Sequence, residues 1–227
     1  MKKAECSLTR QKGLKGFKVV KTLSPIIALL ISLGAGNLQA QEEETLNPVL
    51  DVDSLYTELS SEPIYGRTAA ELLQELEDKH YSRVMFDDQY SSHLFDTYLD
   101  ALDGSKLYFL QSDIDAIEQY RNSLDDTLKS GSIDPAFQIY NVYHRRLLER
   151  LVFAINQVEN SLDTIDYSLD ESIEIDREDA PYATTSAQLD ELWRQRVKNS
   201  ALSLKLANLD QETIEERLSK RYRNQLN

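Results

Sequence analysis

Apolar side chains recur every three or four residues through most of the chain beyond residue 66, which is the spacing of one buried helix face. The pattern predicts six amphipathic helices that start near residues 68, 88, 112, 134, 186 and 210. Residues 68–71 (TAAE) form a capping box, and residues 134–135 (DP) form an N-cap followed by a first-turn proline. Gly104 and Gly131 fall where two periodic runs end. These signals together predict an all-α fold.

Two segments interrupt the helical pattern. Residues 106–110 (KLYFL) are a short apolar run, which we interpret either as an extended segment or as a loop that plugs the core. Residues 163–185 are rich in Asp and Glu and form an acidic connector, in which residues 172–175 (SIEI) read as strand-like. We therefore expect about six helices in an orthogonal or irregular bundle. They form either one bundle or, as we favour, two helical subdomains (67–162 and 186–227) joined by the connector.

The sixth predicted helix ends in a regular apolar stripe. Ile214, Leu218, Tyr222 and Leu226 repeat every four residues and so share one helix face, and no glycine or proline closes the helix before Asn227. We expect this stripe to be open in the chain as given. Its partners would then lie in residues beyond Asn227, and the chain would be the front part of a longer protein.

The opposite end has the pattern of an export signal. Residues 1–23 hold seven basic residues and one acidic one, and an apolar run over residues 26–33 precedes small residues up to Ala40. We predict a signal peptide over 1–40, cleaved after Ala40, with an uncleaved membrane anchor as the alternative. Residues 41–66 are acidic and weakly periodic, which indicates a flexible lead-in. The predicted location is the periplasm, either soluble or peripheral to the inner membrane.

The charge of the chain narrows the classes of partner. The sequence carries a formal charge of −14, from 25 basic and 39 acidic residues. Without residues 1–40, which hold seven of those basic residues and one of the acidic ones, the charge is −20. Such a chain repels nucleic acid, so its acidity serves either solubility or the steering of a basic partner. The single cysteine, Cys6, lies in the predicted signal, which excludes a disulfide or thiol chemistry in the remainder.

Residues that would carry catalysis or bind a metal do not stand out. Glu77 and His80 have the spacing of two metal ligands, but a lone pair of this kind is weak support. The sequence lacks a phosphate-binding loop, a dinucleotide fingerprint and a Gly-x-Ser-x-Gly motif. We therefore predict no catalytic, cofactor-binding or metal-binding residue. Arg145, Arg146 and Arg150 form a basic patch, either as a salt-bridged surface or as a place that recognises a carboxylate.

Several segments, in this order, resemble the N-terminal domain of the tail-specific, or C-terminal processing, peptidases of Gram-negative periplasms. The resemblance covers about residues 67–226. The matching segments are 80–81 (HY), 95–103 (FDTYLDALD), 108–110 (YFL), 112–114 (SDI), 140–142 (YNV), 145–146 (RR), 149–150 (ER), 176–177 (DR), 180–181 (AP), 192–198 (LWRQRVK), 202–206 (LSLKL) and 221–222 (RY).

The resemblance implies a helical platform that precedes a PDZ domain and a serine endopeptidase domain. The family cuts proteins that it recognises by apolar C-terminal tails, and it uses a serine nucleophile with a lysine general base. Those catalytic residues belong to a part of the family pattern beyond Asn227, so no catalytic residue is carried over to this chain. The partners that this implies are the PDZ and protease domains of the parent protein, a periplasmic adaptor protein and protein substrates.

Two hypotheses of different class follow. The first is a noncatalytic N-terminal platform of such a protease, which supports substrate access and partner docking. The second is a standalone exported helical protein that acts as an adaptor or a decoy. We expect no hydrolysis by this chain alone in either case. Residues that would contact a partner or another domain are Arg145, Arg146, Arg150, Trp193, Leu218, Tyr222 and Leu226.

Overall fold

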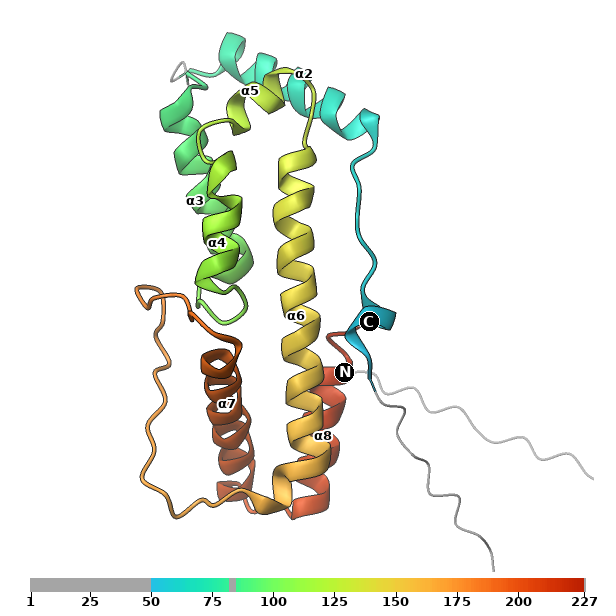
Figure 1. The fold of residues 1–227 in the computed structure, drawn as a ribbon, viewed down its shortest axis with the longest axis vertical. Coiled ribbons are helices and arrows are strands. Elements are labelled where there is room, and N and C mark those ends of the chain that lie inside the picture. Colours follow the sequence, from blue (N-terminus) through green and yellow to red (C-terminus); the bar gives the residue numbers. More distant parts are fainter. Residues whose placement is uncertain (1–49, 82–84, 227) are drawn as a thin grey trace, which may run out of the picture. The chain divides into compact units, whose positions relative to one another are not determined.

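The computed structural model describes residues 50–81 and 85–226, so the predicted signal peptide (1–40) and residues 41–49 of the lead-in (41–66) lie outside the described residues. The described chain is all-α, as predicted, and contains no β-strand within those bounds (Figure 1). The first half holds α1 (Val52–Leu55), α2 (Pro63–Lys79), α3 (Asp88–Asp103), α4 (Gln111–Ile117), η1 (Glu118–Tyr120) and α5 (Leu124–Lys129). The second half holds α6 (Asp134–Ser161), η2 (Leu162–Thr164), α7 (Ser186–Leu206) and α8 (Gln211–Arg223). The rest of the lead-in holds α1 and the first turn of α2, where a flexible segment was expected.

The longest helix, α6, contributes to both of the larger apolar cores. Ile139, near its start, packs with apolar residues of α3, α4 and α5 and with Phe109. Its second half presents a buried row to α7 and α8, made of Leu151, Ala154, Ile155 and Val158. The packing therefore crosses the acidic connector, because helices on both sides of it share the core on α6.

Two predicted helix boundaries are wrong. The first helix begins at Pro63 rather than at Thr68, because a first-turn proline already has the helical φ and lacks an amide that would need a partner. The Thr68 hydroxyl therefore donates to the Ile64 carbonyl at 2.9 Å instead of capping. The helix predicted from Ser112 begins at Gln111, where the Asp113 carboxylate accepts from the Leu110 amide at 2.9 Å, and it breaks into α4, η1 and α5.

A close backbone approach fixes α2 against the end of α5. A Cβ atom placed on Gly66 would lie 1.9 Å from the Gly131 carbonyl oxygen, so only glycine fits at this position of α2. Gly131 has a φ of +81°, the left-handed conformation expected where the preceding helix ends. Gly66 thus lies inside a helix, although the sequence pattern placed it at the edge of the lead-in.

The apolar run 106–110 is a loop that plugs the core, the second of its two predicted forms. The buried Asp103 carboxylate accepts hydrogen bonds from the amides of Leu107, Tyr108 and Phe109, at 2.7, 3.0 and 2.9 Å. These bonds satisfy backbone donors that the loop buries, and Leu107 and Phe109 can therefore point into the core. Leu110 forms one isolated parallel bridge with Ala183 of the connector.

The acidic connector is irregular, and residues 172–175 do not form a strand. Ion pairs nevertheless attach it to the helices. The Glu171 carboxylate contacts Arg194 at 2.8 Å and Lys198 at 2.6 Å, both on α7. The buried Arg177 pairs with Glu174 at 2.8 Å and donates to the Ser105 carbonyl at 3.3 Å. Charge pairs thus hold the connector beside α7, in addition to the apolar packing of Ile165, Tyr167 and Ala183.

Candidate functional site

The three arginines of α6 join other elements to this helix. Arg146 donates to both oxygens of Asp113, on α4, at 2.8 and 2.9 Å, and it also pairs with Glu149 at 2.8 Å. The hydrogen bonds that Arg146 donates to Asp113 raise the pKa of Arg146, so its guanidinium stays charged. Arg146 thus forms ion pairs within the chain, as the salt-bridged interpretation of this patch expects.

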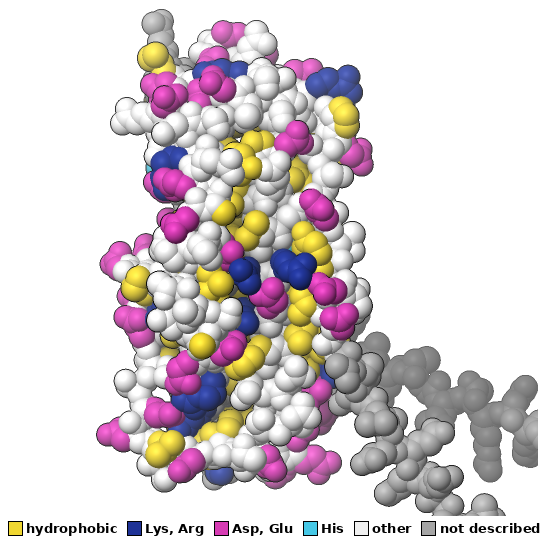
Figure 2. All heavy atoms as spheres, in the orientation of Figure 1, with side chains coloured by type: hydrophobic (Ala, Val, Ile, Leu, Met, Phe, Trp, Pro, Cys, Tyr) yellow, Lys and Arg dark blue, Asp and Glu magenta, His cyan; other side chains and the backbone are white. Residues whose placement is uncertain are grey.

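The other two arginines of the patch have partners in different elements. Arg145 contacts Asp53 of α1 at 2.8 Å, and Arg150 pairs with Asp190 of α7. Figure 2 shows the same mixture on one face of the molecule, where basic side chains lie beside acidic ones. Some of the many acidic residues therefore form ion pairs with arginines of the same chain.

The predicted open stripe on α8 is not open. Leu218 and Tyr222 are only 2% and 6% exposed, and they pack with Ile214 in the core that α6 and α7 share. Leu226 is half-buried against the same core. The reason is the turn after α7, where Asn208 takes a positive φ of 60° and the chain folds back to lay the stripe on α6. The partners of this stripe belong to the chain itself.

Trp193 is a core anchor, as predicted. It is 4% exposed, and its indole Nε1–H donates to the Leu107 carbonyl at 2.8 Å. Its ring centroid lies 5.7 Å from that of Tyr108 and 6.4 Å from that of Tyr222. One side chain thus joins α7 to the loop after α3 and to α8.

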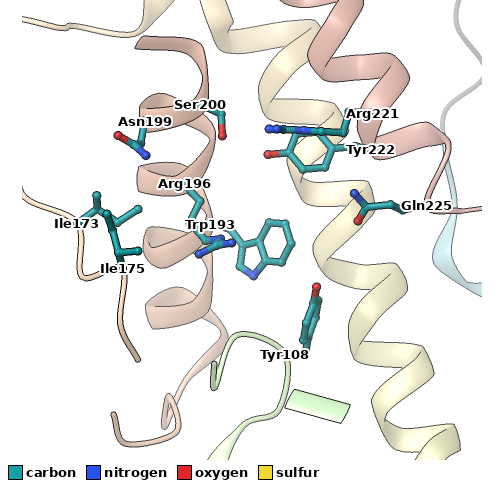
Figure 3. Close-up of a pocket in the computed structure, with 10 residues that line it drawn as sticks. All are labelled: Tyr108, Ile173, Ile175, Trp193, Arg196, Asn199, Ser200, Arg221, Tyr222 and Gln225. Carbon is teal, nitrogen blue, oxygen red and sulfur yellow. The ribbon is translucent and has the colours of Figure 1, made fainter. Parts of the chain in front are cut away.

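A pocket of about 390 Å³ opens over this aromatic cluster, between α7, α8, the connector and the 106–110 loop (Figure 3). Each of these four segments contributes to its lining. The lining residues are Trp193, Arg196, Asn199 and Ser200 of α7, Arg221 and Tyr222 of α8, Gln225 just after α8, Ile173 and Ile175 of the connector, and Tyr108 of the loop. Of these, sequence reasoning named only Trp193 and Tyr222 as contact residues.

Two arginines give this pocket its charge. Arg196 is half-buried and lies 5.9 Å from the centre of the Trp193 ring, while Arg221 is exposed and lies 5.3 Å from the centre of the Tyr222 ring. Burial raises the pKa of Tyr108, and nearby Asp103 raises it further while Arg196 opposes the rise. Tyr108 therefore enters the pocket as a neutral hydroxyl group. The arrangement can donate hydrogen bonds to an anion, whereas it contains no nucleophile with an adjacent base.

The other candidate features offer fewer groups that could bind a ligand or a metal ion. An apolar hollow of about 270 Å³ lies between α3, α5 and the start of α6. Across residues 50–81 and 85–226, no three His, Cys, Asp or Glu side chains are placed to hold a metal ion together. The ring of His80, of the predicted Glu77/His80 pair, lies 4.8 Å from that of Tyr81 between centroids and is tilted by 34° to it. None of the helices in the described part has the length and apolar character needed to cross a membrane.

A family model described as "Tail specific protease N-terminal domain" matches residues 72–227. The chain belongs to this family. A curated relative, the tail-specific protease of Haemophilus influenzae, is 38% identical over 148 residues. This alignment covers 65% of the present chain and 21% of the relative, so the chain spans about a fifth of that protein's length.

Membership in the tail-specific protease N-terminal domain family confirms the resemblance drawn from the sequence. The matched range begins within α2 and contains α3 to α8, together with every residue that lines the pocket over Trp193. Sequence reasoning missed the pocket because its charged pair, Arg196 and Arg221, comes from two helices. Their shared position depends on the turn between α7 and α8, which no local motif reveals.

Proposed function

We propose that this chain is the noncatalytic N-terminal platform of a tail-specific serine endopeptidase, and that it supports substrate access and partner docking. The observation that carries the proposal is the family match over 72–227 on a helical unit whose core is closed by its own side chains. The relative is much longer than the aligned segment, which covers 21% of it. In this proposal, catalysis belongs to the remainder of such a protein. We further propose that residues 1–40 export the chain to the periplasm.

Exposed apolar residues support the docking part of this proposal. Ile64, Tyr65 and Leu72 of α2 are 49%, 51% and 60% exposed. Apolar groups gathered on one helix favour contact with another protein surface. In the proposed role, the partners are the PDZ and protease domains of the parent protein, protein substrates and an adaptor protein.

A standalone adaptor or decoy is the second candidate, and one observation favours it. The α8 stripe is already buried within this chain, so the described helices need no additional domain to complete their core. Such a unit would compete with the matching part of an intact protease for its partners. The platform role predicts that it works as part of that protease instead.

A domain exchange in the Haemophilus influenzae relative tests the platform role. The segment of the relative that aligns with this chain is replaced by the present sequence, or is deleted, and cleavage of a protein with an apolar C-terminal tail is measured. We expect the chimera to cleave this protein and the deletion variant to lose cleavage. Full activity of the deletion variant would contradict the platform role.

Two controls separate the alternatives. The purified chain is assayed alone, and it is also added in excess to the intact relative. We expect no turnover by the chain alone and no inhibition of the intact enzyme. Turnover by the chain alone would contradict a noncatalytic role, and strong inhibition would favour the decoy.

A further inference from the structure

One half-buried cation, Arg196, distinguishes the pocket over Trp193. Arg196 is half-buried, yet it forms neither an ion pair nor a hydrogen bond with any residue in the ranges 50–81 and 85–226. Every other buried or half-buried basic side chain in these ranges pairs with a carboxylate, namely Lys106, Arg121, Arg146, Arg150, Arg177, Arg194, Lys198 and Arg223. Because a partly desolvated guanidinium gains from an anionic partner, Arg196 is suited to one that comes from outside.

The remaining polar groups of the pocket also favour a negatively charged ligand. Arg221 has no ion pair in the described part of the chain either, and Figure 3 shows its side chain directed from α8 toward α7. Ser200, Asn199 and Gln225 add neutral hydrogen-bonding groups. The lining contains no Asp or Glu, although the sequence holds 39 acidic residues. A pocket that is locally positive in a chain of net charge −14 is complementary to an anion.

The walls of the pocket show what the anion would be attached to. The Trp193 indole N–H is already bonded to Leu107, so the ring offers only apolar surface to the pocket. Ile173 is half-buried and Ile175 is 81% exposed at the rim, where each could cover an apolar group. The volume of about 390 Å³ lies near the lower end of ligand pockets, which fits one or two residues of a peptide.

We propose that this pocket binds a carboxylate that lies beside an apolar side chain in a peptide segment. Arg196 and Arg221 hold the carboxylate, while Trp193 and the two connector isoleucines contact the apolar group. The planar guanidinium matches two carboxylate oxygens at once. The carboxylate comes either from a peptide C-terminus or from a Glu or Asp side chain. This site goes beyond the platform role and does not depend on it.

The only tryptophan of the chain lies in the pocket, so its fluorescence reports on this site directly. The purified chain is titrated with acetyl-Gly-Leu as the free acid, with the same peptide as its C-terminal amide, and with acetyl-Leu-Glu-Gly-amide. We expect a saturable change with a carboxylate-bearing peptide and none with acetyl-Gly-Leu-amide. Binding of the first or third peptide identifies the source of the carboxylate. If neither binds, or if the amide binds equally well, the proposal is wrong.

A pair of variants tests the assigned cation. Arg196→Met should weaken binding at least about tenfold, since it removes a charged hydrogen-bonding partner. Arg217→Met is the matched control, because Arg217 is exposed on α8 and lies outside the pocket. Both variants should melt close to the parent, as neither arginine forms an ion pair within the described ranges. Equal loss of binding in both variants, or unchanged binding by Arg196→Met, would overturn the assignment.

Discussion

Two amphipathic helices, α2 and α8, differ in how far their apolar side chains are buried. The shorter one, α8, has 13 residues and buries Ile214, Leu218 and Tyr222 on α6 and α7. The longer one, α2, has 17 residues, yet it buries only Gly66 and Leu73. Its remaining large apolar side chains, Ile64, Tyr65, Leu72 and Leu76, are exposed.

The difference lies in how each helix is attached. An apolar stripe holds α8, and the burial of each large side chain contributes about 1.5–3 kcal/mol. By contrast, a close backbone approach at Gly66, together with the single buried leucine Leu73, holds α2 on α5. A helix can thus have a clear apolar face while that face remains available to a partner. This makes α2 the better candidate for docking and α8 part of the structural core.

The largest expected effect is at Trp193 of α7, the aromatic anchor that contacts Tyr222 of α8. Trp193→Ala should lower the free energy of unfolding by about 3–5 kcal/mol, because it leaves a cavity among three elements. It also leaves the Leu107 carbonyl without its indole donor. Chemical denaturation measures the change. A midpoint equal to the parent's would show that the indole is not a core anchor.

A matched pair of leucines compares the two helices directly. Leu218→Ala on α8 should cost about 2–5 kcal/mol, as expected for a buried leucine. Leu72→Ala on α2 should change the free energy of unfolding by no more than about 0.5 kcal/mol, because its side chain is 60% exposed. Denaturant titration of both variants provides the values. Similar losses in the two would remove the distinction between these helices.

The backbone attachment of α2 can be broken by a single methyl group. Gly66→Ala should destabilise the protein by about 1–3 kcal/mol, because its Cβ would overlap the Gly131 carbonyl and α2 would have to move. Limited proteolysis should then cut α2 before α6. Thr68→Ala, on the exposed side of the same helix, serves as the control. Resistance equal to the parent's in the Gly66 variant would refute the close approach.

The smallest expected effect concerns the ion pair between Glu159 of α6 and Arg223 of α8. Burial raises the pKa of Glu159, but hydrogen bonds from Arg223 and Ser219 outweigh it and hold the pKa below its ordinary value. The stabilisation that this lowered pKa brings is therefore present above the ordinary glutamate pKa, and it is lost as the pH falls through the lowered one.

Glu159→Gln should cost less than about 1 kcal/mol near neutral pH, because the pair is partly exposed to water. The difference from the parent should shrink on acidification. Unfolding free energies of both proteins, measured across that pH range, check this. A difference that stays constant with pH would show that ionised Glu159 does not stabilise the packing of α8.

Local signals were enough to predict most of the fold. The helical period, the Asp210 cap of α8 and the left-handed Gly131 are set by residues near in sequence. The start of α2 was misplaced because the capping box at 68–71 looked stronger than the first-turn Pro63. The break between α4 and α5 was missed because the apolar spacing continues through it.

The site was less predictable, because its residues meet only after the chain turns. The repeat at Leu218 and Tyr222 was visible in the sequence, but whether its partner lay on α6 or beyond residue 227 depended on the turn at Asn208. Arg145, Arg146 and Arg150 were visible as a basic patch, while each of them pairs with an acidic residue that is distant in sequence. Arg196 looked like any other charge within residues 192–198, because its lack of a partner is a property of the folded chain.

Amide hydrogen exchange tests the central claim, that α8 belongs to the core of this domain while α2 is attached at its edge. The exchange rates of amides along both helices are compared in the unmodified chain. We predict that amides near Leu218 exchange only with global unfolding, and that those near Leu72 exchange much faster through local opening. Fast exchange along α8, at rates equal to those of α2, would contradict this account of the fold.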